Sequence, residues 1–120
     1  MSLFKKKKNN FMEEFKRFRV VGILEEDYHT LKKRELVSVR YEPETQQCVI
    51  CSQTRPYDDE DGCWTTSIVK RIGIKSSEWR REGHLLTIKT ANSVITVRIP
   101  EEEYERASNI IEVFTKSMIA

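Results

Sequence analysis

The residues whose spacing suggests chemistry most directly are the three cysteines. Cys48 and Cys51 have the C-x-x-C spacing of redox and zinc sites, and Cys63 follows later in the chain. A redox pair gains thiolate character at a helix start, whereas these two lie in an expected strand, where residues three apart face opposite sides. A zinc site would need the backbone to distort and bring the cysteines together with His29 or His84. We therefore expect buried structural cysteines and neither a metal nor a cofactor.

An acidic run, Asp58-Asp59-Glu60-Asp61, precedes Gly62 and raises the question of calcium. If Gly62 is aligned with the EF-hand glycine, Tyr57 falls at the first ligand position and Ile68 at the last, where carboxylates are required. The EF-hand pattern therefore fails. We expect a solvated loop, with the docking of a protein as its functional alternative.

Nucleophilic catalysis has little support. The chain contains two histidines, His29 and His84, and neither lies in a G-x-S-x-G context. The G-x-G-x-x-G and P-loop patterns of nucleotide-binding proteins are also missing. His84 follows Glu82-Gly83, and we expect it at a solvated turn. The sequence therefore predicts a protein without catalytic residues and without a small-molecule substrate, that is, not an enzyme.

Basic and aromatic residues favour a different chemistry, the binding of phosphate groups. Trp79, Arg80 and Arg81 stand together in an expected loop, and this combination can stack on bases and bind phosphates. Further basic positions on the expected strands could extend the surface, together with Trp64. These positions are Lys70, Arg71, Lys75, Lys89 and Arg98.

The first residues form a separate basic cluster. It contains four consecutive lysines, Lys5, Lys6, Lys7 and Lys8. Behind it, Phe11, Phe15 and Phe18 recur at helical spacing, which predicts a helix ending near residue 18 whose phenylalanines pack on the rest of the domain. Residues 1–10 then form a flexible basic tail, able to contact an anionic membrane or nucleic acid.

The clearest element that must position these residues is a C-terminal helix. Pro100 suits a first helical turn, and residues 101–103, all glutamates, place negative charge at the positive end of the helix dipole. Apolar residues then recur at spacings of three and four. They are Tyr104, Ala107, Ile111, Phe114 and Met118. We expect a helix over residues 101–118.

Two hairpins can be checked for register. In the hairpin of residues 85–89 and 94–99, pairing Ile88 with Ile95 turns the apolar residues of both strands to one face. In the hairpin of residues 36–41 and 46–52, the expected pairing sets Val39 against Cys48.

Two further strands are expected on either side of the earlier hairpin. Residues 19–24 form one of them, and residues 64–74 form the other. In the second, Ile68, Ile72 and Ile74 share one side.

Strands that pair with their neighbours through short turns indicate an α+β domain that is mainly β. We expect a small antiparallel β-barrel or half-barrel of about six to seven strands, preceded by the N-terminal helix and capped by the C-terminal helix. A chain of 120 residues fits one such domain.

The composition limits the partners. A net charge of +2, from 21 basic and 19 acidic side chains, exerts no strong field on nucleic acid or membrane, so any electrostatic function must come from local clusters. No stretch approaches the ~18 apolar residues of a membrane span, and no apolar signal follows the lysines. An odd number of cysteines suits a reducing compartment. We expect a cytoplasmic protein that can also lie at the membrane surface.

The run of residues 68–74, the strands 85–90 and 94–99, and the helix from Glu101 resemble the second half of a bacterial pleckstrin-homology-like domain. In that family a similar succession of strands leads into a C-terminal capping helix. The resemblance extends over about residues 64–118, and residues 19–53 are compatible with the earlier strands. It implies that residues 11–120 form one non-enzymatic scaffold for protein or lipid contacts.

Two functions from different classes follow. The first is a binding module that docks a protein partner or an acidic membrane surface. The alternative is a small regulatory protein that binds RNA or single-stranded nucleic acid on a compact barrel. The candidate contact residues are Lys5, Lys6, Lys7, Lys8, Lys70, Arg71, Trp79, Arg80, Arg81, Lys89 and Arg98.

Overall fold

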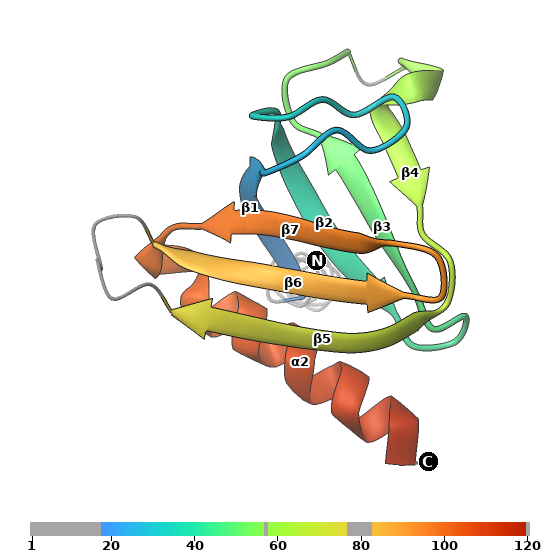
Figure 1. Ribbon diagram of the computed structural model, residues 1–120, viewed down its shortest axis with the longest axis vertical. Coiled ribbons are helices and arrows are strands. Elements are labelled where there is room, and N and C mark those ends of the chain that lie inside the picture. Colours follow the sequence, from blue (N-terminus) through green and yellow to red (C-terminus); the bar gives the residue numbers. More distant parts are fainter. Residues whose placement is uncertain (1–17, 57, 77–82, 120) are drawn as a thin grey trace, which may run out of the picture.

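The computed structural model describes residues 18–56, 58–76 and 83–119 (Figure 1). Its sheet consists of β1 (Arg19–Leu24), β2 (Leu36–Glu42), β3 (Gln47–Ser52), β4 (Cys63–Thr65), β5 (Val69–Ser76), β6 (His84–Thr90) and β7 (Val94–Ile99). The helix α2 (Tyr104–Ile119) ends the described chain, and the short 3-10 helices are η1 (Glu60–Gly62) and η3 (Glu101–Glu103).

All seven strands belong to one antiparallel sheet in the order β4-β3-β2-β1-β7-β6-β5. The edge strands β4 and β5 do not pair with each other in the described residues, so the sheet is open. The prediction of a mainly β, antiparallel fold with a C-terminal helix is confirmed, whereas a closed barrel is not.

The expected basic tail and N-terminal helix fall almost entirely on residues 1–17, outside the described residues. Phe18, the last residue of that helix in our prediction, instead forms a turn before β1. Its side chain is 37% exposed, so the predicted burial of this phenylalanine is not observed.

The strand β1 joins the two halves of the sheet. It pairs with β2 from Arg19 to Ile23, but with β7 only through Ile23 opposite Arg98 and Leu24 opposite Val97. At this seam Gly22 allows β7 to come close, because a Cβ atom there would lie 2.5 Å from the carbonyl oxygen of Arg98. Beyond the seam, β5, β6 and β7 cross over β1, β2 and β3 (Figure 1).

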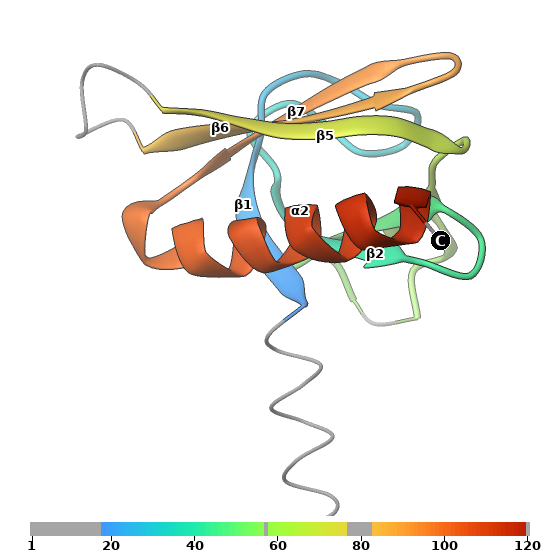
Figure 2. The same cartoon turned by 90° about the horizontal axis from the view of Figure 1, so that it is seen from below.

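The hydrophobic core lies on the inner side of the bent sheet, and α2 contacts β1, β2 and β5 there (Figure 2). The helix buries Ala107, Ile110 and Phe114, while Tyr104 and Met118 of the expected stripe are 42% and 52% exposed. The helix is therefore confirmed, but its buried stripe is narrower and includes Ile110. No helix among the described residues is both long enough and apolar enough to cross a membrane.

One hairpin register was predicted correctly and the other was not. Ile88 pairs with Ile95 as expected. In the β2–β3 hairpin, however, Val39 pairs with Ile50 and not with Cys48, a shift of two residues along β3. The turn is displaced by one residue along the chain: it spans residues 43–46, and it ends at Gln46 with a φ of 58°. Because a shift of two preserves the alternation of a strand, the same residues still face the core.

The expected strand of residues 64–74 is split into β4 and β5. Between them, the backbone N–H of Thr66 donates to the carbonyl oxygen of Cys48 over 2.9 Å. A β-bulge then interrupts β5 between Val69 and Arg71. The bulge changes the alternation, so Val69 and Ile72 are both buried, while Ile68 is 48% exposed.

Candidate anion-binding surfaces

Basic side chains gather on the outer face of β5 and β6. Arg71 lies directly opposite Lys89, and Lys75 lies farther along the same face of β5. Between Arg71 and Lys75, Gly73 leaves open space, since a Cβ atom there would meet nothing within 4 Å. A shallow groove of about 300 Å³ runs along these residues and reaches Val94 on β7. We call the surface formed by Arg71, Lys75 and Lys89 the cationic face.

Among the described residues, no neighbouring acid balances the charge of the cationic face. Like charges placed directly opposite each other destabilise an antiparallel pair. In the described part of the chain, no acidic residue borders the groove and none of these three side chains forms an ion pair. All three are exposed. The arrangement is unfavourable for the isolated fold and favourable for an anion lying across the groove.

Exposed apolar residues adjoin the cationic face at one corner. Val94, which is 50% exposed, pairs with Lys89. The turn before it is tied to the segment preceding β5, because the side-chain amide of Asn92 donates to the Ser67 hydroxyl over 3.0 Å. Ile68 follows in that segment. This corner therefore combines two exposed apolar side chains with basic ones.

The other predicted contact residues on the strands are only partly brought together. Lys70 is the extra residue of the bulge, exposed beside Arg71. Arg98 is neutralised, since its Nε atom lies 2.5 Å from a carboxylate oxygen of Glu25. Trp64 does not join the cationic face, because its ring stacks on Tyr28 with 5.7 Å between ring centroids.

The remaining predicted contact residues cannot be placed. They lie outside the described residues: Lys5, Lys6, Lys7, Lys8, Trp79, Arg80 and Arg81.

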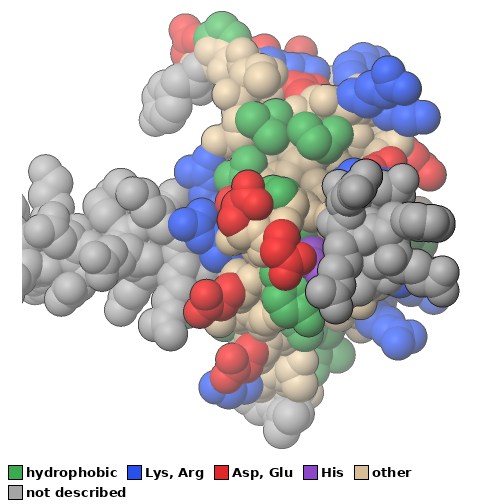
Figure 3. All heavy atoms as spheres, turned by 90° about the vertical axis from the view of Figure 1, so that its left-hand side faces the viewer, with side chains coloured by type: hydrophobic (Ala, Val, Ile, Leu, Met, Phe, Trp, Pro, Cys, Tyr) green, Lys and Arg blue, Asp and Glu red, His purple; other side chains and the backbone are tan. Residues whose placement is uncertain are grey.

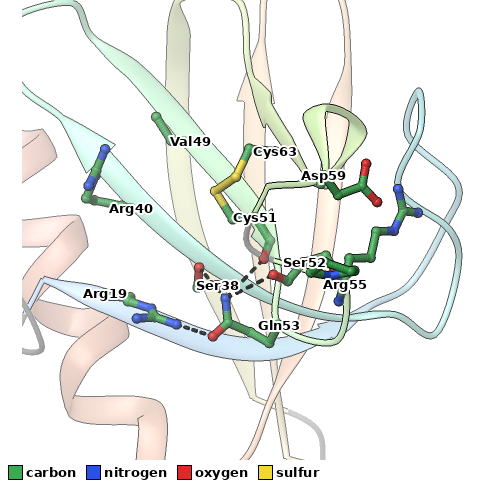
Figure 4. Close-up of a pocket in the computed structure, with 12 residues that line it drawn as sticks. Arg19, Ser38, Arg40, Val49, Cys51, Ser52, Gln53, Arg55, Asp59 and Cys63 are labelled. Carbon is green, nitrogen blue, oxygen red and sulfur yellow. Dashed lines mark hydrogen bonds between the residues drawn. A yellow bond between two sulfur atoms is a disulfide. The ribbon is translucent and has the colours of Figure 1, made fainter.

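A second basic surface, which the sequence did not reveal, lies on the outer face of β1, β2 and β3. A cleft of about 340 Å³ is lined at one end by Arg19 and Arg40 and at the other by Arg55 and Asp59 (Figure 4). Arg19 and Arg40 are direct partners across β1 and β2. We call this the arginine cleft. The signal that could have found it is the β1–β2 register, which the long connection between these strands hides.

Arg55 is held in place by the β1–β2 connection. Its Nε atom lies 2.8 Å from a carboxylate oxygen of Glu35, and its Nη1 donates to the carbonyl oxygen of Asp61 over 3.0 Å. Burial raises the pKa of the Glu35 carboxyl, but the backbone N–H of Lys32, the Ser52 hydroxyl and the Arg55 guanidinium outweigh burial. The pKa of Glu35 therefore lies below its usual value.

A disulfide forms part of the wall of the arginine cleft. Cys51 and Cys63 are direct partners across β3 and β4, with their Cα atoms 4.1 Å apart. The prediction of buried thiols is therefore wrong for Cys51 and Cys63 and right for Cys48. Burial raises the pKa of the Cys48 thiol to about 12. Because Cys48 and Cys51 face opposite sides of β3, only one of them enters the core. The cysteine count thus no longer supports a reducing compartment.

Two other expectations concern polar loops. His84 is not at a solvated turn: it begins β6, is only 8% exposed, and places Nε2 2.5 Å from a carboxylate oxygen of Glu101. The acidic run includes η1, at whose start the Asp59 side chain accepts the backbone N–H of Asp61. Among the described residues, no group of three or more His, Cys, Asp or Glu side chains is placed to hold a metal ion.

A third hollow, of about 640 Å³, lies between β1 and the corner where β7 meets η3. Its lining combines Ile23 and Leu36 with the glutamates at 101–103. Figure 3 shows this end of the molecule, where acidic side chains lie next to hydrophobic ones. The acidic rim makes this hollow unsuitable for an anion.

Comparisons of the chain with protein-family models, with curated proteins and with solved structures give no match. Function must therefore be inferred from the geometry of these surfaces.

Proposed function

We propose that this protein is a non-enzymatic binding module whose cationic face docks on an anionic membrane surface. The observation that carries the proposal is the meeting of Arg71, Lys75 and Lys89 on one exposed face, where no acid of the described residues borders the groove. Each basic side chain near an anionic leaflet contributes about 1 kcal/mol. The three together would contribute about 3 kcal/mol, or roughly a hundredfold in affinity.

The apolar corner supports a membrane as the occupant. Ile68 and Val94 are about half exposed and adjoin the basic side chains, so they can enter the interfacial layer while the charges contact headgroups. Membrane attachment commonly needs two signals. In this proposal the second signal is the block of four lysines at residues 5–8.

Nucleic acid is less favoured as the occupant. Single-stranded binding surfaces combine basic grooves with aromatic side chains on which bases stack. In the described part of the chain, no aromatic residue borders the groove of the cationic face, and the Trp64 ring stacks on Tyr28 instead. The resemblance to pleckstrin-homology-like domains stays a prediction from the sequence; it would imply a scaffold for lipid or protein contacts, in keeping with the proposal.

The proposed place of action is the cytoplasmic leaflet, where anionic lipids are concentrated. A stable disulfide is unusual in that compartment. The oxidation state of Cys51 and Cys63 in protein alkylated at the moment of cell lysis tests this location. Complete oxidation in the cell would argue for an oxidising compartment and against the cytoplasmic leaflet.

Vesicle co-sedimentation tests the docking proposal. The wild-type protein should sediment with phosphatidylcholine vesicles that contain phosphatidylserine and not with phosphatidylcholine alone. The double variant R71E/K89E should lose this binding. The matched control K32E/K33E, which makes the same charge change on the exposed β1–β2 connection, should keep most of it.

Two results would overturn the proposal. One is equal sedimentation with and without phosphatidylserine, and the other is an equal loss in both double variants. A gel shift with a random RNA pool at two salt concentrations covers the alternative. Salt-sensitive RNA binding that R71E/K89E abolishes, without vesicle binding, would assign the cationic face to nucleic acid.

A further inference from the structure

The disulfide between Cys51 and Cys63 lies at an exposed edge of the sheet. Among the described residues, β4 pairs only with β3, so the bond joins an edge strand to its single neighbour (Figures 1 and 4). Cys51 is partly buried and Cys63 is exposed, which leaves the bond open to attack by a thiol from solution. Exposed disulfides are the ones that open and close in regulation, whereas structural ones resist reduction.

The two ends of β4 are held differently. Just before the strand, the Asp61 carbonyl oxygen accepts from the Thr30 hydroxyl over 2.7 Å and from Arg55 over 3.0 Å. Just after it, the Thr66 N–H donates to the Cys48 carbonyl oxygen over 2.9 Å, and the Cys48 N–H donates to the Thr66 hydroxyl over 3.0 Å. β4 itself has three residues, and short edge elements of this kind open locally. Opening the disulfide therefore weakens the start of β4, while Thr66 still fixes its end.

The middle residue of β4 connects the strand to the cationic face. The Trp64 ring stacks on Tyr28, with 5.7 Å between ring centroids and 12° between ring planes. The Tyr28 hydroxyl donates to the carbonyl oxygen of Val94, which is closer than the Glu26 carboxylate at 3.4 Å. Val94 is half exposed and borders the groove of the cationic face. Direct contacts thus lead from β4 to the apolar corner that the docking proposal places in the membrane.

The rest of the apolar corner does not depend on β4. Ile68 follows Thr66 and Ser67, and the Ser67 hydroxyl accepts from the Asn92 amide over 3.0 Å. This hydrogen bond also ties the turn before Val94 to the segment preceding β5. Release of β4 should therefore loosen Val94 without dismantling the corner, and it should weaken docking without abolishing it.

A dithiol reductant supplies the opening reaction. Its thiolate attacks the Cys63 sulfur, and the Cys51 sulfur leaves as a thiolate and takes up a proton. The second thiol of the reductant then resolves the mixed disulfide and releases Cys63 as a thiol. Two electrons have passed to the cysteine pair, and the dithiol has become a disulfide. Closing the bond is the reverse exchange with an oxidised dithiol.

We propose that Cys51 and Cys63 form a reversible thiol–disulfide switch, which fixes β4 when oxidised and releases it when reduced. The oxidised form holds Tyr28 against Val94 and docks more tightly on the membrane. This effect on docking rests on the proposed function, whereas the release of β4 does not. Disulfides of reducing compartments are usually transient and redox-sensing, so a switch also fits the cytoplasmic leaflet.

Hydrogen–deuterium exchange followed by mass spectrometry tests the release of β4. The segment of residues 60–65 should exchange up to about a hundredfold faster in wild-type protein reduced with dithiothreitol, because a disulfide across a sequence separation of 12 shifts an opening equilibrium by that order. The β6–β7 hairpin should exchange at the same rate in both forms. C51S/C63S should match reduced protein with or without dithiothreitol, which controls for the reductant.

Two results of this experiment would overturn the switch. One is equal exchange of residues 60–65 in the oxidised and reduced forms. The other is faster exchange across the whole sheet, including the β6–β7 hairpin, which would mean that reduction unfolds the domain and does not release β4 alone.

Sedimentation with vesicles of phosphatidylcholine and phosphatidylserine tests the effect on docking. Oxidised wild-type protein should bind roughly fivefold to tenfold more tightly than reduced protein, as expected when part of one apolar side chain no longer inserts. Tyr28→Phe keeps the ring but loses the hydroxyl, so its two forms should bind alike. Tyr41→Phe is the matched control, since it removes a hydroxyl that pairs with Ser117 instead, and it should keep the difference.

The outcomes separate the switch from the docking proposal. Equal binding by the two forms of wild-type protein would overturn the link from β4 to the membrane, as would an undiminished difference in Tyr28→Phe. No binding by either form would overturn the docking proposal and the link together, while the exchange result still decides the release of β4.

Reversibility is tested in cells by alkylating thiols at lysis. The pair should be mostly reduced in untreated cells, become oxidised after addition of the thiol oxidant diamide, and return to the reduced state after its removal. A pair that stays fully oxidised or fully reduced throughout would overturn the switch.

Discussion

The seam between β1 and β7 can be tested by the single substitution Gly22→Ala. Only two residue pairs join these strands, so the two halves of the sheet depend on a close approach at Gly22. A Cβ atom there would lie 2.5 Å from the Arg98 carbonyl oxygen, 2.7 Å from a methyl of Val97 and 2.9 Å from a methyl of Ile99. The methyl groups can rotate away, but the carbonyl oxygen moves only if the β7 backbone moves.

The expected cost follows from these contacts. Overpacking of this kind costs typically about 1–3 kcal/mol, and the contact with the backbone places Gly22→Ala near the upper end. Replacing glycine by alanine also removes freedom from the unfolded chain, which returns about 0.4–1 kcal/mol. The net loss should be about 2 kcal/mol, which for a domain of this size lowers the melting temperature by roughly 6–10 °C.

Gly73→Ala is the matched control, because a Cβ atom at position 73 meets nothing within 4 Å. This variant should be as stable as wild type or more stable by about 0.4–1 kcal/mol. Thermal and urea unfolding, followed by circular dichroism, compare the two variants. Equal stabilities would refute the close approach of β1 to β7, and with it the single continuous sheet.

Three further predictions concern the cysteines and the partly buried Glu35. C51S/C63S should lose about 3 kcal/mol in urea unfolding, because the disulfide closes a loop with a sequence separation of 12; unchanged stability would contradict this estimate. The Cys48 thiol, with a pKa of about 12, should resist alkylation at pH 8 until the protein unfolds, and rapid labelling of folded protein would show that it is accessible. The pKa of Glu35 is lowered in the fold, so its contribution to stability is present above its unfolded pKa and lost as the pH falls through the lower folded pKa. Glu35→Gln should therefore flatten the acid side of the curve of stability against pH, and an unchanged acid side would refute this role.

The sequence predicted which strand residues face the core better than it predicted which residues pair across neighbouring strands. The inward residues of β2 and β3 were correct although Val39 was given the wrong partner, because a shift of two leaves alternation intact. What fixes the register is a turn that ends at Gln46 in a left-handed conformation. Glutamine gives no sequence signal for that conformation, unlike glycine or asparagine.

Surface sites were harder to predict, because they depend on which strands become neighbours. Arg71 and Lys89 were identified as basic strand residues, and their direct pairing follows from the β5–β6 register, including its bulge. Arg19 and Arg40 were not identified, since their pairing spans the long β1–β2 connection. The disulfide was missed for a similar reason, because Cys63 reaches its partner only through the short strand β4.

On the outer face of β5, β6 and β7, the ion pairing of Arg98 can be compared with that of the three basic residues of the cationic face. Arg98 lies on this face and is matched with Glu25, so the fold does neutralise a basic residue there. Arg71, Lys75 and Lys89 share the face and have no such partner among the described residues. A protein with 19 acidic residues and a net charge of only +2 has enough acids to balance these positions as well. A solvated sheet face requires polar side chains but not side chains of one sign, and like charges placed opposite each other weaken the sheet. The three basic residues therefore fit a contact with an external anion better than they fit the needs of the fold.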